Sequence, residues 1–409
     1  MSFLSRYRSG IGFALLYLAF LISYVDRAAI SLALGQIGKD FNLGAADLGI
    51  VISAFFLGYA AMQVPGGWLA DRFGSKLVVV AAIAMWSVFT VMTSLAWSLT
   101  SLIVIRLIFG LTEGAFPAAS IKAVTEMFDK PSHPKLSALL TSSNYAGSML
   151  APLIMAPLII AFGWRRAFEM IGFAGAAFAL VYFVLVPHIR PGSGIPAASA
   201  TPLAEVKTAG RRELLKNPFM WQLLTVWFGL SCVNKGLDSW MPVYLLQQRG
   251  LDLKAVGLLT PIPFLLATIA TASGGWVMTT FFADREKYLL IGSATLTGVF
   301  VYAMYKSQTI AALIFFQSLA YFFKSFVLAT VVALPTKVLP ADQIGTGFGM
   351  VNFGGQSAGF VAPSIMGFRV GGTGSFDAAF DFLLVMIAVA VAVATTIKTR
   401  EPQLIESLA

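Results

Sequence analysis

Residues 22–29 read Ile-Ser-Tyr-Val-Asp-Arg-Ala-Ala and place two oppositely charged residues, Asp26 and Arg27, inside an apolar run that spans residues 10–34. The run exceeds the about 20 residues that an α-helix needs to cross a bilayer. An ionisable side chain at that depth is costly, so it usually faces the interior of a helix bundle or a water-filled cavity. Because a carboxylate can bind a proton and a guanidinium can bind an anion, the stretch predicts a buried polar site within a membrane-spanning helix.

The composition of the whole chain is that of a membrane protein. Of the 409 residues, 58% are hydrophobic and only 11% are charged, and the mean hydropathy is +0.81. Soluble domains carry about 25% charged residues, so the composition excludes a soluble globular protein. The net charge of +9 does not require a nucleic-acid partner, because the cytoplasmic loops of membrane proteins collect Lys and Arg. The single cysteine, Cys232, excludes an internal disulfide and a multi-cysteine metal site, and we expect no metal or cofactor.

The apolar runs predict an all-α membrane protein with twelve transmembrane helices in two pseudo-symmetric six-helix bundles. A basic N-terminus followed by an apolar run is also typical of a secretory signal. This run is too long for a signal and contains Asp26 and Arg27, so we expect it to remain as the first span. The expected spans are 10–34, 46–70, 76–97, 101–127, 137–162, 166–187, 219–246, 255–281, 287–305, 309–336, 342–368 and 377–396.

Basic residues outside the spans predict the orientation of the chain. With the N-terminus inside, the loops after the odd-numbered spans are external. The cytoplasmic segments then hold more than twice as many Lys and Arg residues as the external ones. Since basic residues accumulate on the cytoplasmic side, this bias predicts that both termini lie in the cytoplasm.

One long polar stretch, residues 188–217, separates the two sets of six expected spans. It begins with Pro and Gly residues, becomes rich in Ala and Pro, and then carries the basic pair Arg211-Arg212. Such a composition is typical of a flexible linker. The sequence therefore predicts an N-terminal bundle over residues 1–187, a cytoplasmic linker over 188–217 and a C-terminal bundle over 218–409.

Three short motifs recur at one offset of 208 residues, which indicates that the two halves are repeats of each other. Parallel repeats of this kind place the substrate between the halves, near the middle of the membrane. The repeat keeps a cation in both halves, Arg27 and Lys235, but an acid in the first half alone, Asp26. The matching segments are 66–68 with 274–276 (both Gly-Gly-Trp), 144–147 with 352–355 (Asn-Tyr-Ala-Gly and Asn-Phe-Gly-Gly), and 25–27 with 233–235 (Val-Asp-Arg and Val-Asn-Lys).

Two further charged residues lie in the fourth expected span, where Arg106 and Glu113 stand seven residues apart. Two helical turns place them on one face, about 10 Å apart along the axis. Asp26 and Glu113 are the expected proton-coupling acids. A substrate carboxylate that displaces an acid from an arginine, Arg27 or Arg106, favours protonation of that acid, so anion and proton promote each other's binding. The alternative is that the four residues only form neutralising ion pairs that fix helix packing.

The C-terminal half contributes two more lysines within expected spans, Lys235 and Lys324. Lys324 has no acid within one helical turn and is an expected second anion contact, whereas Lys235 and Asp238, at i and i+3, also fit a simple intrahelical pair. Lys122, with Glu126 at i+4, is expected to reach the membrane surface. Polar residues expected either to line a pocket or to form hydrogen bonds between helices are Tyr24, Tyr59, Asn144, Asn352 and Gln356.

Residues 67–76, Gly-Trp-Leu-Ala-Asp-Arg-Phe-Gly-Ser-Lys, resemble the signature loop of the major facilitator superfamily, and the resemblance covers nearly the whole chain. In that family the loop follows the second span and acts in conformational gating. The resemblance therefore implies a gating role for Asp71 and Arg72. Ser75 stands where the family pattern usually has the first of two basic residues, and the C-terminal copy is interrupted, so we expect unequal gating contacts in the two halves.

A narrower resemblance, to the anion:cation symporter branch of that family, rests on residues 24–27, 59–68 and 106–113 and on Asn352. The branch includes bacterial transporters of sugar acids such as galactonate, glucarate and hexuronates, and is related to the vesicular glutamate and sialic acid carriers. The two lysines of the C-terminal half have no match in the branch as a whole. They leave open a substrate with two anionic groups, such as an aldarate, an aromatic dicarboxylate, a sulfonated acid or a phosphate ester.

The branch also implies roles for individual residues. Asp26 and Glu113 would handle protons, and Arg27 would bind the substrate carboxylate. Arg106 would modulate Glu113. The residues that the resemblance places along the pocket are Tyr24, Tyr59, Asn144 and Asn352.

These observations predict a secondary active transporter that couples uptake of an organic anion, such as a sugar acid, an aldarate or another carboxylate, to protons by alternating access. An anion exchanger of organophosphates or dicarboxylates is the alternative. Drug efflux fits less well, because lipophilic cations favour acids without paired arginines. No cluster of nucleophile, base and orienting residue indicates an enzyme. We expect a monomer in the bacterial cytoplasmic membrane, with the anion, protons and the lipid bilayer as its partners.

Overall fold

The computed structural model describes residues 3–129, 132–186, 216–283, 285–338 and 344–397. No β-strand occurs within these ranges. Residues up to 215 of the expected linker lie outside them, so the expected division into domains stays a prediction. The helices are α1 (Phe3–Phe41), α2 (Ala45–Phe73), α3 (Ser75–Ser94), α4 (Leu99–Gly114), α5 (Phe116–Met127), α6 (His133–Leu185), α8 (Pro218–Gln247), α9 (Leu253–Leu259), α10 (Pro261–Phe281), α11 (Glu286–Lys306), α12 (Ile310–Val338), α13 (Ile344–Thr373) and α14 (Asp377–Thr396).

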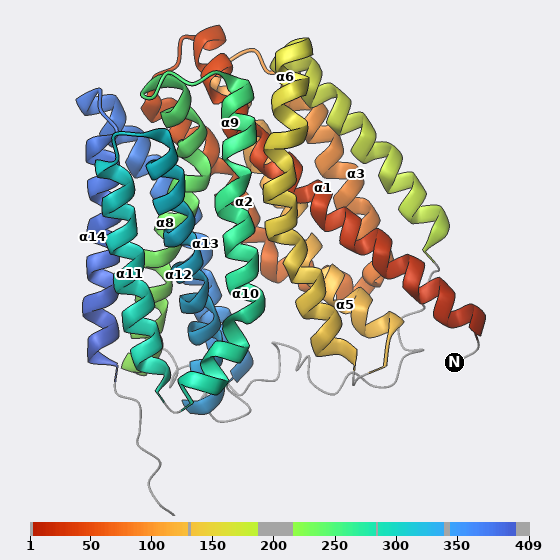
Figure 1. The fold of residues 1–409 in the computed structure, drawn as a ribbon. Coiled ribbons are helices and arrows are strands. Elements are labelled where there is room, and N and C mark those ends of the chain that lie inside the picture. Colours follow the sequence, from red (N-terminus) through yellow and green to blue (C-terminus); the bar gives the residue numbers. More distant parts are fainter. Residues whose placement is uncertain (1–2, 130–131, 187–215, 284, 339–343, 398–409) are drawn as a thin grey trace, which may run out of the picture.

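Helices from the first half of the chain pack mainly on one another, and so do helices from the second half (Figure 1). In the first half, α6 packs on α1 and α3, and α2 packs on α4. In the second half, α8 packs on α13 and α14, while α12 packs on α10 and α11. Among the described residues, the main contacts between the halves are those of α2 with α13, of α1 with α8, and of α6 with both α9 and α10. The site described below lies along these joining helices.

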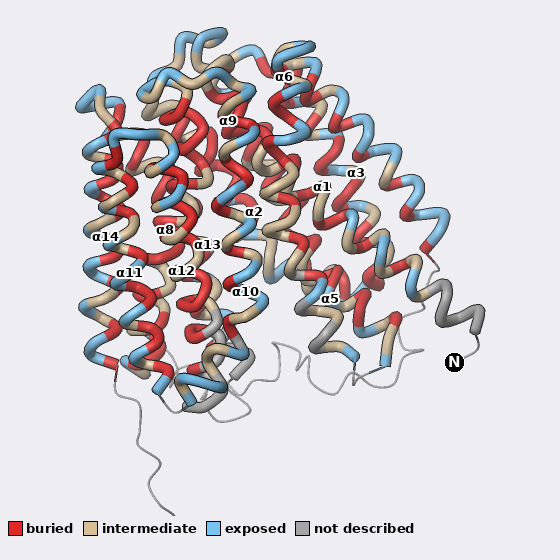
Figure 2. The backbone as a smooth tube through the Cα atoms, in the orientation of Figure 1, coloured by how far each residue is buried: buried red, intermediate tan, exposed pale blue. Residues whose placement is uncertain are grey.

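Nine helical segments of the described residues are long and apolar enough to cross a membrane. Buried residues line the inner faces of the helices and exposed residues lie on the outer faces (Figure 2). The outer faces carry large apolar side chains such as Val184, 68% exposed, and Phe173, 64% exposed, both on α6. Water-soluble proteins rarely expose so much apolar surface, so these faces fit lipid. The all-helical membrane fold is confirmed, whereas the twelve-span count and the two-bundle division stay predictions.

Three helix breaks explain how the described elements differ from the expected spans. The segment Ser142–Leu185 is 44 residues long, more than twice the ~20 residues that cross a bilayer. It contains a break at Gly163, whose φ of 76° and ψ of 164° fit glycine, so α6 covers the two spans expected on either side. The spans expected at 101–127 and 255–281 are each divided, into α4 and α5 and into α9 and α10, just before a proline near the helix start.

Two glycines let α2 and α4 touch backbone to backbone. A Cβ atom on Gly58 would lie 2.1 Å from the carbonyl oxygen of Leu107, and one on Gly110 would lie 2.0 Å from that of Phe55. No side chain fits in such a space, so only glycine permits this approach. The close approach brings the last turn of α4, with its buried polar groups, against the middle of α2.

A second close contact joins the two halves through α2 and α13. A Cβ atom on Gly49 would lie 2.6 Å from the carbonyl oxygen of Pro363. Ser364 donates a hydrogen bond to Ser53 at 2.7 Å, and Trp240 of α8 donates from Nε1 to the Pro363 carbonyl at 3.1 Å. These contacts leave no space for a ligand between α2 and α13 at this level.

Candidate functional site

Arg27, on α1, forms the central contact of the site. Its Nη2 donates to Oε1 of Glu113, on α4, at 2.7 Å, and the Glu113 side chain is only 1% exposed. The Arg27 Cζ also lies 4.4 Å from the ring centroid of Tyr24, 4.6 Å from that of Tyr59 and 5.1 Å from that of Phe55. The charge-assisted hydrogen bond and the cation–π contacts together hold the guanidinium in one orientation.

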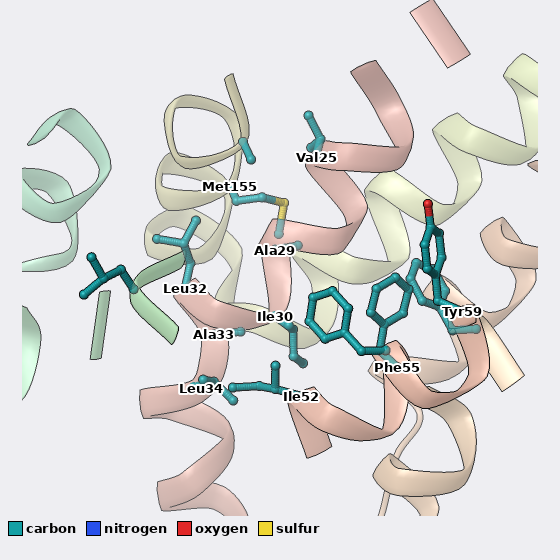
Figure 3. Close-up of a cluster of buried hydrophobic side chains, with 14 of the residues drawn as sticks. Val25, Ala29, Ile30, Leu32, Ala33, Leu34, Ile52, Phe55, Tyr59 and Met155 are labelled. Carbon is teal, nitrogen blue, oxygen red and sulfur yellow. The ribbon is translucent and has the colours of Figure 1, made fainter. Parts of the chain in front are cut away.

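Apolar side chains of α1 and α2 surround this ion pair. Ile30 on α1 and Ile52 and Phe55 on α2 lie side by side in the buried cluster, with Tyr59 one turn further along α2 (Figure 3). Phe55 is fully buried. Such packing keeps water away from the Glu113 end of the pair and strengthens the attraction between the two charges.

The sequence leaves open which acid pairs with which arginine. The structure pairs Arg27 with Glu113, and no ion pair within the described residues joins Asp26 to either arginine. Consecutive residues of a helix point about 100° apart, so Asp26 and Arg27 face different neighbours. Arg106, expected to act on Glu113, forms no ion pair with it in the described chain. Its guanidinium lies instead beside Phe55 and Phe109, 5.0 and 4.8 Å from the ring centroids.

Asp26 is buried, at 1% exposure, beside Trp86 and Thr90 of α3. Neither carboxylate oxygen has a hydrogen-bond partner in the described part of the chain. Nor do the Nε atoms of Arg106 and Arg27. An ionised carboxylate without a partner is expensive in such a place, so Asp26 is a candidate site for binding a proton.

Two adjoining cavities bring most of the expected pocket residues together. A cavity of about 770 Å³ lies toward the start of α6 and α13, a volume typical of a ligand site. A smaller one, of about 80 Å³, extends it toward α2, and both share Tyr24, Lys235 and Asp238. Expected residues lining the larger cavity are Tyr24, Asn144, Lys235, Lys324, Asn352 and Gln356, and those lining the smaller one are Tyr24, Arg27, Arg106 and Lys235.

Three expected residues do not line either cavity. Tyr59 stacks on Arg27, while Asp26 and Glu113 lie behind the arginines that form the wall. Asn352 also fulfils the alternative role of a contact between helices, because its Nδ2 donates to Oε1 of Gln63 on α2 at 3.4 Å. The acids therefore act on a ligand only through their neighbours in this arrangement.

The C-terminal half of the wall holds a hydrogen-bond network that the sequence does not predict. Asp238 accepts hydrogen bonds from Nδ2 of Asn234 at 2.6 Å and from the Tyr321 hydroxyl at 2.5 Å. Lys324 donates to Oδ1 of Asn234. The Lys235–Asp238 pair suggested by their spacing is wrong: no ion pair joins them in the described residues, and Lys235 Nζ lies 4.8 Å from the ring centroid of Phe56.

The missed residues left a weak signal in the sequence. Tyr321 precedes Lys324 by three positions, and Asn234 precedes Asp238 by four, so each pair shares one helix face. The spacing does not reveal that α8 and α12 turn these faces toward each other. That contact depends on packing between helices 90 residues apart in sequence.

Comparison with known proteins identifies the family. Residues 16–363 match the Major Facilitator Superfamily. The chain belongs to that family. A crystal structure of a bacterial homolog of the human lysosomal transporter Spinster, in an inward-facing and unoccupied conformation, superposes with a TM-score of 0.83 at 17% identity. It covers 97% of this chain and 96% of the other, which confirms the Major Facilitator Superfamily fold.

Similar members of the superfamily are bacterial transporters of organic acids. A hexuronate transporter of Bacillus subtilis is 29% identical over 376 residues, 89% of each chain. A "probable sulfoacetate transporter" of Cupriavidus necator is 30% identical (89% and 87% covered), and a "probable galactarate/D-glucarate transporter" of Escherichia coli is 28% identical (90% of each). These relatives confirm the resemblance to the anion:cation symporter branch, and they confirm that the chain is a multi-pass membrane transporter and not an enzyme.

The superfamily's signature loop follows α2, and its acid contacts α5. Asp71 Oδ1 lies 2.8 Å from Nζ of Lys122, which also donates to the carbonyl of Ala70 at 2.9 Å. Glu126, the partner suggested for Lys122 by spacing, is 4.0 Å away and accepts a 2.5 Å hydrogen bond from Ser75. Lys122 therefore ties α5 to the end of α2 instead of only reaching the membrane surface.

Arg72 faces aromatic rings in place of an acid. Its Cζ lies 5.3 Å from the ring centroid of Trp68 and 5.5 Å from that of Phe73. Within the described residues, no ion pair joins it to the other half of the protein. Both rings belong to α2, so these two contacts do not join the halves.

Proposed function

We propose that this transporter takes up an organic anion together with protons by alternating access. The observation that carries the proposal is the buried Arg27–Glu113 ion pair, in which the cation lines the cavity and the acid lies behind it. A carboxylate that enters the cavity competes with Glu113 for Arg27. The relatives named for hexuronate, sulfoacetate and galactarate transport support an organic acid as the substrate.

Competition for Arg27 couples the anion to the proton. When a substrate carboxylate takes the guanidinium, Glu113 loses its counter-ion inside an apolar layer, where its charged form is costly. Protonation of Glu113 then stabilises the loaded state. Asp26 is the second proton site, since it is buried without an ion-pair partner in the described chain, and the charged groups that act on it are Glu113 and Arg106. Because linkage is reciprocal, each bound proton also favours the anion.

The position of the cavity supports entry of the ligand from one side of the membrane. The close contact at Gly49 and Pro363 blocks the path between α2 and α13, while the larger cavity lies toward the first turns of α6 and α13. We propose that both termini are cytoplasmic, as the basic residues predict. The cavity then opens to the cytoplasm, in a monomer in the bacterial cytoplasmic membrane.

An anion exchanger is the second candidate. Lys235 and Lys324 line the cavity, and neither forms an ion pair with an acid in the described chain. Cations that need no proton partner are sufficient for exchange of one anion for another. In this case Asp26 has a structural role only.

Transport by the purified protein in liposomes separates these candidates. We expect a labelled sugar acid to accumulate when the compartment it enters is alkaline, and accumulation to stop when a protonophore removes the pH gradient. Exchange against unlabelled anion without any response to the pH gradient would instead establish the exchanger. No movement of any organic acid would refute both.

We also propose that the Asp71–Lys122 contact acts in gating. Replacing Asp71 by Asn removes the charge, but Asp71 is 67% exposed, so the ion pair contributes at most about 1 kcal/mol to stability. We expect the maximal transport rate to fall about 10-fold with the substrate Kd unchanged, because the contact lies outside the cavity and affects only the conformational step.

Asp377→Asn is the matched control, since Asp377 is exposed at the start of α14. It is expected to transport at the wild-type rate. A normal transport rate in Asp71→Asn, or a Kd that changes in step with the rate, would remove the gating role.

A further inference from the structure

The walls of the two cavities carry an excess of positive charge. Four cations and one acid line them within the described residues: Arg27, Arg106, Lys235, Lys324 and Asp238. In the first half, Asp26 and Glu113 behind the wall balance the two arginines in number. In the second half, Asp238 alone faces two lysines. The second half therefore keeps one uncompensated positive charge when all these groups are ionised.

Lys235 is the cation available to a ligand. It is half-buried, lines both cavities and forms no hydrogen bond or ion pair among the described residues. Its ammonium lies 4.8 Å from the ring centroid of Phe56, and a cation–π contact of this kind is worth only about 1 kcal/mol. An ammonium so weakly held can turn toward an anionic group at little cost.

Lys235 and Arg27 face the same space from opposite halves. Arg27 stacks on Phe55, Lys235 stacks on Phe56, and the centroids of these two rings lie 5.0 Å apart. Lys324 extends the row of cations into the larger cavity. A short, extended molecule with an acidic group at each end can therefore contact Arg27 with one end and the lysines with the other.

Three side-chain amides line the space between these ends. Asn144 and Gln356 line the larger cavity and Gln317 lines the smaller one. The amide oxygen of each is buried without a hydrogen-bond partner in the described chain. The last torsion of an amide turns over a broad range, so each can present a donor or an acceptor to a ligand. Hydroxyl groups satisfy either choice.

We infer that the substrate is a hydroxylated organic dianion, with a carboxylate at one end and a second acidic group at the other. This inference rests on the proposed function, because it assigns the first carboxylate to Arg27. Lys235 binds the second acidic group, with Lys324 beside it. The two negative charges of a dianion offset more of the excess positive charge of the walls than a single carboxylate does. A buried site with less uncompensated charge is electrostatically less costly inside the membrane.

A matched pair of six-carbon acids tests the inference. Galactarate and galactonate have the same four secondary hydroxyls and one carboxylate in common, and differ in a second carboxylate against a hydroxymethyl group. We expect the wild-type protein to bind galactarate at least about 10-fold more tightly, a difference of about 1.4 kcal/mol. Adipate, the dianion of equal length without hydroxyls, is expected to bind more weakly than galactarate.

Substitutions then test which residues bind the second acidic group of the dianion. Lys235→Gln and Lys324→Gln are each expected to weaken galactarate binding about 10-fold or more, and galactonate binding less than about threefold. Lys235→Arg is expected to restore most of the galactarate affinity. Lys306→Gln is the matched control, because Lys306 is exposed, lines neither cavity and has its ammonium beside the rings of Tyr302 and Tyr305.

Galactonate binding as tight as galactarate binding in the wild-type protein would overturn the inference, even if a lysine variant fails to fold. An equal loss of affinity for galactarate and for galactonate in Lys235→Gln would also overturn the inference. Proton-linked transport of galactonate with no preference for galactarate would contradict the dianion but leave the proposed function intact. Binding of both acids without any dependence on protons would contradict the proposed function and leave the dianion preference intact.

Discussion

Asp26→Asn is expected to abolish accumulation of the anion against its gradient while leaving exchange of one anion for another. Asparagine has the same shape as the acid and is uncharged, so the packing around α3 is preserved. It cannot gain or lose a proton, so the step that links the pH gradient to the substrate is lost. Substrate binding at low pH should change by less than about threefold, under about 0.7 kcal/mol.

The measurement is uptake of labelled acid into liposomes, with and without a pH gradient, and exchange under equal pH on both sides. Asp377→Asn, at an exposed position, is the control for the substitution itself. Full accumulation driven by the pH gradient in Asp26→Asn would exclude Asp26 as a coupling residue. Loss of exchange and binding together would point to a structural role instead.

Arg27→Gln is expected to lower substrate affinity at least about 100-fold, which is about 2.8 kcal/mol. The substitution removes the cation that the substrate carboxylate needs. It also leaves the Glu113 charge buried without a partner, and breaking a buried pair in this way costs about 3–5 kcal/mol of stability. The variant should therefore melt at a lower temperature than the wild-type protein in detergent.

A second substitution separates these two effects. The double variant Arg27→Gln with Glu113→Gln should regain most of the thermal stability, because no buried charge remains, but it should not regain binding. Glu113→Gln alone frees Arg27 and should bind the anion at least as tightly as the wild-type protein, with less dependence on pH. Binding within about threefold of wild type in Arg27→Gln would show that the carboxylate is held elsewhere.

Much of the site could be predicted because charged residues are rare in membrane helices. Asp26, Arg27, Arg106 and Glu113 stand out in apolar runs, and repeat symmetry points from Arg27 to Lys235. A charge within a span faces the bundle interior on energetic grounds alone, so the sequence identifies the cations that line the cavity without any knowledge of packing.

The pairing of these charges could not be predicted, because it depends on contacts between helices. Arg27 on α1 pairs with Glu113 on α4. Gly58 and Gly110 let α2 and α4 approach closely, and this contact sets where Glu113 lies along α2. Residue spacing within one helix favoured Lys235 with Asp238. The hydroxyl of Tyr321 on α12 instead bonds to Asp238, a contact 83 residues apart in sequence.

The helix breaks show a similar limit. Prolines near 117 and 261 are visible in the sequence, yet hydropathy alone joins the residues on both sides into single spans. Proline lacks an amide hydrogen and fits well in the first turn of a helix, and a new helix starts at each of these two positions. Hydropathy indicates how many residues cross the membrane, whereas backbone hydrogen bonding decides where the helix is continuous.

Proton uptake on substrate binding tests the central claim most directly. The purified protein in weakly buffered detergent solution is mixed with excess sugar acid near neutral pH, and the protons taken up per anion bound are counted. The account predicts net proton uptake by the wild-type protein and a smaller uptake by Asp26→Asn and by Glu113→Gln. Binding of the anion with no proton uptake by the wild-type protein would contradict the coupling of the Arg27 site to these acids.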